Sequence, residues 1–159
     1  MHLHILAVGR IKERYLVDGI REYQRRLRPY ARVNVTEVAD CPFSPWPSAQ
    51  ERQNVLAAEA AALQKHLSGG TRLVAFDRRG RAVSSEEFAA LLADAALYGQ
   101  SHVTFLIGGA LGLDPSLLRA ADDVLSFSRL TFPHQMFRLI LFEQVYRACK
   151  INKREPYHW

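Results

Sequence analysis

Two loops in the second half of the chain have residue types that can hold a small molecule. The first, Gly108-Gly109-Ala110-Leu111-Gly112, follows an apolar run, and glycine backbone can pass close to a ligand because it has no Cβ. Its GGxxG spacing differs from the GxGxxG of dinucleotide loops, and no acidic residue about 20 positions on ends a second strand. We therefore disfavour a nucleotide-dependent oxidoreductase, and a tight turn without a ligand stays open as an alternative.

The second loop, Ser126–His134, lies between an apolar run and a helix start and contains no glycine. Its backbone N–H groups can hold an adenine edge while Leu130 and Phe132 wall the ring, because small-molecule sites combine apolar walls with a few fixed polar groups. His134 ends the loop, and a neutral imidazole can relay a proton near pH 7. The alternatives are ordinary core contacts for Leu130 and Phe132, and a helix-capping role for His134.

Two basic segments suggest a nucleic-acid partner. The tail after Arg147 mixes cationic and aromatic residues and ends in Pro156-Tyr157-His158-Trp159. Cations neutralise phosphates and aromatic rings stack on unpaired bases, so the tail is a candidate RNA contact. Near the N-terminus, a basic stripe at helical spacing comprises Arg21, Arg25, Arg28 and Arg32. The alternatives are a solvated terminus and a solvated helix face.

An alternation of apolar runs and helix-forming segments must position these loops. Strands are predicted over Leu3–Val8, Val33–Val38, Leu73–Phe76, His102–Ile107 and Val124–Phe127. Helices are predicted over Lys12–Arg28, Ala49–Leu67, Ser85 to about Leu97, a short stretch after Asp114-Pro115, and Pro133 to about Cys149. The three prolines of Asp40–Ser48 indicate a loop, and Asp77–Arg81 reads as a turn. The alternation predicts an α/β fold with a mainly parallel sheet, whose ligand lies beyond the carboxyl ends of the strands.

The charge is distributed unevenly along the 159 residues. Residues 1–32 carry eight Lys or Arg and three Asp or Glu, residues 33–128 carry seven and eleven, and residues 129–159 carry six and two. Basic ends around an acidic middle exclude a uniform polycation. The pattern is compatible with a protein whose two basic ends together meet an anion.

Several classes of protein are excluded by composition. The apolar runs fall far short of the ~20 residues that span a bilayer, and no basic region precedes the first of them as in a signal peptide. The two cysteines form no disulfide framework, and the scattered histidines show no metal-ligand spacing. We expect a single domain over residues 1–159, located in the cytoplasm, without a metal and without a membrane partner.

Five motifs in fixed order carry a resemblance that extends from end to end. They are Leu6-Ala7-Val8-Gly9-Arg10, Ile107-Gly108-Gly109 with Gly112-Leu113, Ser126-Phe127-Ser128 through Thr131-Phe132-Pro133-His134, Glu143-Gln144-Val145-Tyr146-Arg147-Ala148, and Pro156-Tyr157-His158. With these motifs the chain resembles the RlmH family of SPOUT-class methyltransferases, which modify a pseudouridine of large-subunit ribosomal RNA.

The resemblance implies a fold and a cofactor. The fold is a SPOUT-type, mainly parallel sheet flanked by helices with a C-terminal deep trefoil knot, in which roughly residues 73–159 make the knot and the cofactor pocket. Members use S-adenosylmethionine and are homodimers whose active sites draw on both protomers. Carried over position by position, the cofactor contacts are Phe76, Gly108, Gly109, Phe127, Ser128, Arg129, Leu130, Thr131 and Phe132. The chain departs from the family at Phe76, where members often have Leu, and at Ala110-Leu111, where some have a more polar pair.

The resemblance also implies a reaction, the transfer of a methyl group to N3 of a pseudouridine in helix 69 of 23S rRNA, on assembled ribosomes. Candidates for a catalytic group that accepts the N3 proton are His134, Tyr157 and His158, and the alternative is that the proton goes to water without a protein base. Candidates for RNA contacts are Arg21, Arg25, Arg138, Lys153 and Arg154. The alternative is a non-catalytic rRNA-binding or ribosome assembly factor with a SPOUT-like fold, which would bind no S-adenosylmethionine.

Overall fold

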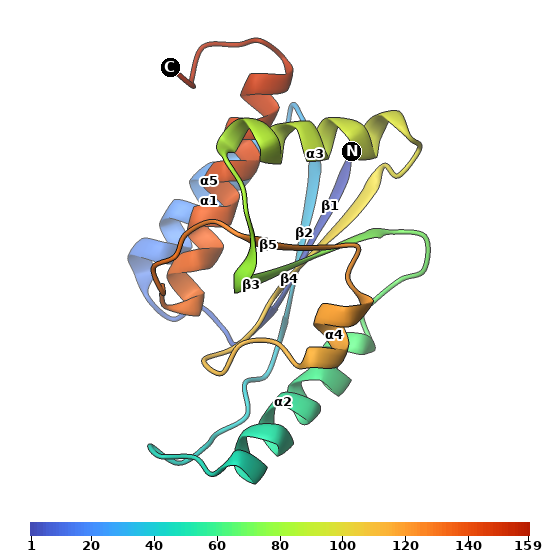
Figure 1. Ribbon diagram of the computed structural model, residues 1–159. Coiled ribbons are helices and arrows are strands. Elements are labelled where there is room, and N and C mark those ends of the chain that lie inside the picture. The colour runs from blue at the N-terminus through green and yellow to red at the C-terminus, as the bar shows by residue number, and fades with distance from the viewer.

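The computed structural model describes residues 1–159 as a five-stranded sheet covered by helices (Figure 1). In chain order the elements are β1 His2–Val8, α1 Arg14–Leu27, β2 Arg32–Val38, α2 Ala49–Gln64, β3 Arg72–Ala82, α3 Ser85–Leu97, β4 His102–Ile107, α4 Pro115–Ala120, β5 Asp123–Ser126 and α5 His134–Asn152. All strand pairs are parallel, in the order β2-β1-β4-β3-β5. The predicted α/β fold with a parallel sheet is confirmed.

The strands are apolar on both faces because helices cover both faces. Along β1, Leu3, Ile5 and Ala7 belong to a core cluster that includes α1, α3 and α5, whereas Leu6 and Val8 belong to a second cluster with α2 and α4. Figure 1 shows the same division into three layers, with α1, α3 and α5 on one side of the sheet and α2 and α4 on the other. Successive strand residues point to opposite faces of the sheet, so a continuous apolar run is typical of a strand that is buried on both faces.

The third strand extends beyond its predicted end. The segment Asp77–Arg81, predicted as a turn, lies within β3, and that prediction is wrong. The pairing of β3 with β5 shifts register between Phe76 and Arg81 and then resumes, so the residues between them bulge from the strand. A Cβ at Gly80 would lie 2.7 Å from the backbone carbon of Leu125, which explains why a glycine is the last residue of the bulge. Helix α5 also continues past Cys149, to Asn152.

A buried arginine joins the start of α5 to the ends of β1 and β2. The Arg138 side chain is 1% exposed. Its guanidinium donates to the carbonyl oxygens of Val8 and Gly9, at 3.2 and 2.9 Å, and forms an ion pair with Glu37. Burial lowers the pKa of Arg138, and the Glu37 carboxylate opposes that shift. Arg138 was expected to contact RNA, but the structure corrects this expectation, because the guanidinium is buried and both of its terminal nitrogens bind groups of the protein.

We predict that Arg138→Met lowers the free energy of unfolding by about 3 kcal/mol, since it removes charged hydrogen bonds from a dry site. The estimate is at the low end for a buried pair because Glu37 is 32% exposed and can be hydrated. Urea denaturation measures the change as a lower midpoint at constant slope. The matched control is Arg119→Met, at an exposed position without an ion pair, which should stay within about 0.5 kcal/mol. Equal midpoints for the two variants would contradict the role given to Arg138.

Candidate functional site

A pocket of about 780 Å³ lies at the carboxyl ends of β3, β4 and β5. Three segments that are distant in sequence line it, around Phe76–Arg79, Ile107–Gly112 and Leu125–His134. Eight of the nine expected cofactor contacts lie on its wall, and the exception, Arg129, is exposed outside the lining. His134 is also part of the lining. The glycine loop and the loop after β5, which were separate candidates in the sequence, therefore line the same cavity.

The glycine loop folds tightly on itself and forms one side of the pocket. The N–H of Gly112 donates to the Gly109 carbonyl at 3.0 Å, and Gly112 has a φ of +88°. A Cβ at Gly108 would lie 2.3 Å from the Gly112 carbonyl oxygen, which is impossible without moving the loop. A tight turn and a ligand-binding loop were alternatives for this segment. They are compatible, because the glycines that allow the tight turn also line the pocket with backbone atoms.

The loop after β5 forms the opposite side and combines an apolar wall with local hydrogen bonds. The Ser126 hydroxyl donates to the Ser128 carbonyl at 2.9 Å, and the Ser128 hydroxyl accepts from the Leu130 N–H at 2.9 Å. Behind the loop, the rings of Phe76 and Phe127 lie 4.9 Å apart between centroids. The pocket therefore has the composition of a small-molecule site, with an aromatic wall and a short polar loop of fixed shape.

His134 begins α5 and faces the end of β1. A Cβ at Gly9 would lie 3.2 Å from His134 Nε2, so glycine at this position leaves space for the imidazole. Gly9 also has a φ of +83°, a conformation that favours glycine. Burial lowers the pKa of His134, and the positive charge of Arg138 lowers it further, whereas Asp40 opposes the shift. The imidazole is therefore neutral at pH 7 and able to accept a proton.

The rim of the pocket is cationic, and part of it comes from an element that sequence analysis did not connect with the site. Asp77, Arg78 and Arg79 line the rim from the bulge of β3, and Arg79 pairs with Asp77 at 3.1 Å. Arg52, in the second turn of α2, also lines the pocket and was missed. No local signal separates it from an ordinary solvated helix residue, since its position depends on how α2 crosses the sheet.

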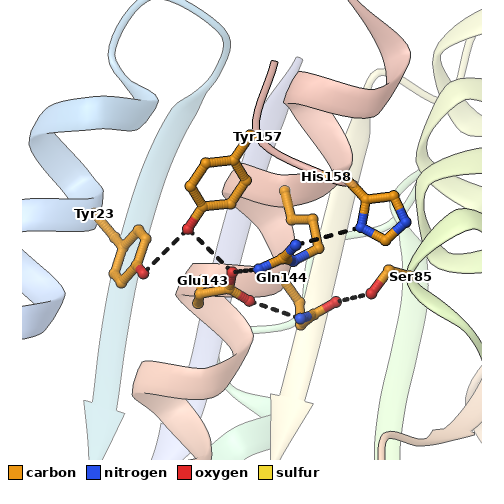
Figure 2. Close-up of polar contacts among 7 residues, drawn as sticks. Tyr23, Ser85, Glu143, Gln144, Tyr157 and His158 are labelled. Carbon is orange, nitrogen blue, oxygen red and sulfur yellow. Dashed lines mark hydrogen bonds and ion pairs between the residues drawn. The ribbon is translucent and has the colours of Figure 1, made fainter. Parts of the chain in front are cut away.

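The C-terminal tail is folded against the helices of its own chain, as Figure 2 shows. The Tyr157 hydroxyl donates to Glu143 at 3.1 Å, and the Arg147 guanidinium lies over the Tyr157 ring at 4.8 Å. His158 hydrogen-bonds to Arg147 through Nδ1, at 3.3 Å, and to Glu86 through Nε2, at 2.7 Å. Burial, together with Tyr23 and Glu143, raises the pKa of Tyr157. In this arrangement the Tyr157 hydroxyl is a hydrogen-bond donor and not a base.

The docked tail is remote from the pocket of the same chain. Glu143, its main anchor, is nine residues after His134, which corresponds to about 14 Å along α5. No residue after Phe137 lines the pocket. Within one chain, the structure therefore brings His134 to the cofactor contacts, but it does not bring Tyr157 or His158 there.

The remaining expected RNA contacts lie on the surface of the layer formed by α1 and α5. Arg21 and Arg25 have side chains that are 75% and 68% exposed, and Arg25 pairs with Glu22 at 2.8 Å. Lys153 and Arg154 are exposed just after α5, and Arg154 has a φ of +55°. The two basic segments are thus on neighbouring helices, and their contact with RNA stays a prediction. No group of three His, Cys, Asp or Glu side chains is placed to bind a metal ion, and no helix is long and apolar enough to cross a membrane.

Comparison with known proteins gives the same assignment along the whole chain. Residues 1–158 match a family model described as a predicted SPOUT methyltransferase. A protein of Moorella thermoacetica, named "Ribosomal RNA large subunit methyltransferase H", is 50% identical over 158 residues, which cover 99% of each chain. A protein of the same name from Desulforamulus reducens is 51% identical over 158 residues and 98% of each chain.

Solved structures support the fold at much lower identity. A probable methyltransferase from Bordetella pertussis superimposes with a TM-score of 0.54 at 11% identity, covering 92% of this chain and 95% of that chain. A probable methylase family protein from Haemophilus influenzae has a TM-score of 0.53 at 12% identity and covers 99% of this chain and 70% of that chain. Taken with the full-length family match and the close relatives, the fold and pocket show that this chain belongs to the SPOUT methyltransferases, in the family of ribosomal RNA large subunit methyltransferase H, RlmH.

Proposed function

We propose that this protein transfers a methyl group from S-adenosylmethionine to N3 of pseudouridine 1915, in helix 69 of 23S rRNA, on assembled ribosomes in the cytoplasm. One observation carries the proposal. Eight of the nine family cofactor positions line one cavity, in a chain about half identical over its length to proteins named ribosomal RNA large subunit methyltransferases. A nucleotide-dependent oxidoreductase has no comparable support.

The pocket fits S-adenosylmethionine by shape and chemistry. At Gly108 and Gly109 the backbone itself borders the cavity, where a Cβ would collide with neighbouring atoms. Leu130 and Phe132 can enclose an adenine ring, and the loop from Phe127 to Phe132 offers backbone groups to its edge. When bound, S-adenosylmethionine supplies a methyl group already activated by a sulfonium.

The residues of the chain then have two tasks. The first is to hold the base so that N3 is aligned with the methyl group, because positioning accounts for much of the catalysis of such a transfer. The second is to remove the N3 proton. His134 is neutral at neutral pH and lies on the pocket wall, so it is the proton acceptor in this proposal. The exposed arginines Arg52 and Arg78 at the rim can bind phosphates of the RNA.

The proposal includes a homodimer with shared active sites. The tail of one chain is anchored about 14 Å along α5 from His134 and does not line its own pocket. A tail that takes part in catalysis must therefore leave this anchorage or come from a partner protomer. In this proposal Tyr157 and His158 act in the partner's site, and the basic residues Lys153 and Arg154 accompany them to the RNA.

We also infer the C-terminal trefoil knot within a single domain over residues 1–159. Three segments lie close together around the pocket: the bulge of β3, the glycine loop and the residues from Phe127 to Pro133. The chain then continues into α5, which packs against α1. The very close approach of Gly80 to Leu125 belongs to the same crowding. Residues 73–159 contain most of the pocket, although Arg52 adds to it from outside that range.

The first prediction is that the purified protein incorporates labelled methyl groups into ribosomes from a strain that lacks this enzyme, and that Gly108→Ala abolishes the incorporation. The variant forces a Cβ into the Gly112 carbonyl oxygen and deforms the cofactor cradle. Calorimetry should show binding of S-adenosylmethionine and S-adenosylhomocysteine by the wild type, no binding of NAD, and loss of cofactor binding in the variant.

The matched control for Gly108→Ala is Gly69→Ala, since a Cβ at Gly69 meets no atom within 4 Å and no positive φ is involved. This control should bind and methylate as the wild type does. Cofactor binding without methylation of ribosomes, subunits or free RNA would contradict the proposed reaction. Absence of cofactor binding in the wild type would favour the non-catalytic assembly factor.

The second prediction concerns the proton acceptor. His134→Ala should slow single-turnover methylation about 100-fold or more, the usual contribution of a general base, while RNA binding is retained. Because the folded protein lowers the pKa of His134, the wild-type rate should be constant at neutral pH and fall only as pH drops below about 6.5. This acid limb should persist in His158→Ala and disappear in His134→Ala. A His134→Ala enzyme that binds cofactor and RNA normally and reacts at a near-normal rate would exclude His134 as the base.

The third prediction is that deletion of Pro156–Trp159 abolishes methylation and leaves the Kd for S-adenosylmethionine within about twofold. The reason is that no tail residue lines the cofactor pocket of its own chain. Calorimetry and the labelled-methyl assay on the same preparation separate the two effects. Loss of cofactor affinity in the truncated protein would instead place the tail in the cofactor pocket.

A further inference from the structure

The connection between β2 and α2 carries the most unusual exposed side chain near the pocket. Trp46 is 93% exposed, and Phe43 in the same connection is 37% exposed. Figure 1 shows this connection as the loop that projects from the molecule at the end opposite the C-terminal tail. Neither aromatic residue packs against the core clusters, and the mechanism above uses neither of them.

The loop is stiff, so its aromatic side chains are held outward in a defined arrangement. Trp46 lies between Pro45 and Pro47, and a third proline, Pro42, precedes Phe43. Proline fixes its own φ and also restricts the residue before it, so the backbone of Trp46 has little freedom to lose on binding. Between the two aromatic residues, the backbone N–H and hydroxyl of Ser44 donate to Glu51 at 2.8 and 2.6 Å.

Both ends of the loop are attached at the edge of the pocket. At its start, Asp40 lies beside Gly9 and His134, and the Cys41 N–H donates to the buried Glu59 at 3.0 Å. At its end, Ser48 caps α2, whose second turn brings Arg52 to the pocket wall. Three extended residues and one helical turn separate Trp46 from Arg52, so their Cα atoms are at most about 15 Å apart.

The surroundings of the loop favour a partner that is both anionic and aromatic. Arg10, Arg52 and Arg78 are exposed at this edge and form no ion pair, whereas the carboxylate of Glu51 is engaged by Ser44. Unpaired nucleotides combine a phosphate with a flat base, and aromatic side chains in ssRNA-binding proteins stack on such bases. A second copy of the chain or another protein would not by itself explain why exposed arginines without ion pairs lie at the same edge of the pocket as the loop of an exposed tryptophan.

We propose that Trp46, with Phe43 beside it, is a stacking platform for an unpaired base of the RNA substrate that flanks the base in the pocket. This inference rests on the proposed function, since it takes the RNA loop as the ligand. The arginines at the rim bind the backbone phosphates between the two bases, and the platform fixes the register of the RNA against the cofactor pocket. Trp46 is thus an RNA-positioning residue that does not touch the reacting atoms.

Intrinsic fluorescence can test the platform because the chain has only two tryptophans, Trp46 and Trp159. In a Trp159→Phe background, the emission reports on Trp46 alone. Titration with a helix 69 hairpin RNA should quench this emission, whereas a fully paired RNA of the same length should leave it unchanged at equal saturation. Equal quenching by both RNAs, or quenching by neither while the hairpin binds, would overturn the proposal.

Kinetics on ribosomes tests the positioning role. Trp46→Ala should raise KM for the RNA substrate about tenfold, within the range measured for loss of one base–aromatic stack. We expect Trp46→Phe to restore most of the loss, with kcat and cofactor Kd unchanged in both variants. The matched control is Tyr98→Ala, which removes a 77% exposed aromatic ring at the end of α3 and should leave KM unchanged.

The outcomes separate this inference from the proposed function. An unchanged KM for Trp46→Ala in an enzyme that methylates normally overturns the platform alone. A wild type that methylates no RNA overturns the proposed reaction, and the fluorescence titration then still decides whether Trp46 stacks on unpaired bases. A change of mass in solution on Trp46→Ala, measured by light scattering, would show that the residue contacts a second copy, and the RNA platform would be rejected.

Discussion

The site depends on one buried charge, the guanidinium of Arg138. It donates hydrogen bonds to the carbonyls of Val8 and Gly9 at the end of β1 and pairs with the carboxylate of Glu37 on β2, so the start of α5 is fixed against the ends of two strands. His134 lies one turn before Arg138 and therefore faces Gly9 with little freedom to move. The same positive charge helps to keep this imidazole neutral. Arg138 thus helps to position the proposed base and adds to the effect of burial, which is the larger cause of its lowered pKa.

The pocket itself is made by backbone that approaches backbone. Gly108 lies against the carbonyl of Gly112, and Gly80 lies against the chain at Leu125, both at separations that no side chain would allow. Such contacts hold three crossing segments close together without filling the space between them, and the aromatic rings of Phe76 and Phe127 close the back of the cavity. The glycines allow the segments around the cavity to approach each other closely. The packed aromatic rings keep the wall of the cavity in place.

Periodicity and turn chemistry predict most of this fold, and they fail where distant segments decide the outcome. The apolar runs of β1 and β4 and the helix predicted from Ser85 to about Leu97 lead directly to the observed elements. The turn signal of residues 77–81 is overridden because β5 offers a second partner to β3 after the bulge. Arg138 was named as a candidate RNA contact, and its burial could not be predicted because the groups that it binds are about 100 or more residues away along the chain. Arg52 and the docking of the tail were beyond prediction for the same reason.

The C-terminal tail is held by contacts that it can give up in favour of contacts with RNA. Its hydrogen bonds join side chains that are partly exposed, so each contributes little to stability because water competes for the same groups. Glu86, for example, is strongly acidic beside His158, with a pKa of about 2, yet its side chain is 61% exposed. A few such bonds can be given up when RNA phosphates and bases offer stronger partners to the same cations and rings. The pocket, in contrast, is held by close backbone packing and by the buried guanidinium of Arg138. The cofactor pocket is thus held more firmly than the tail, so the tail can leave its anchorage while the pocket keeps its shape.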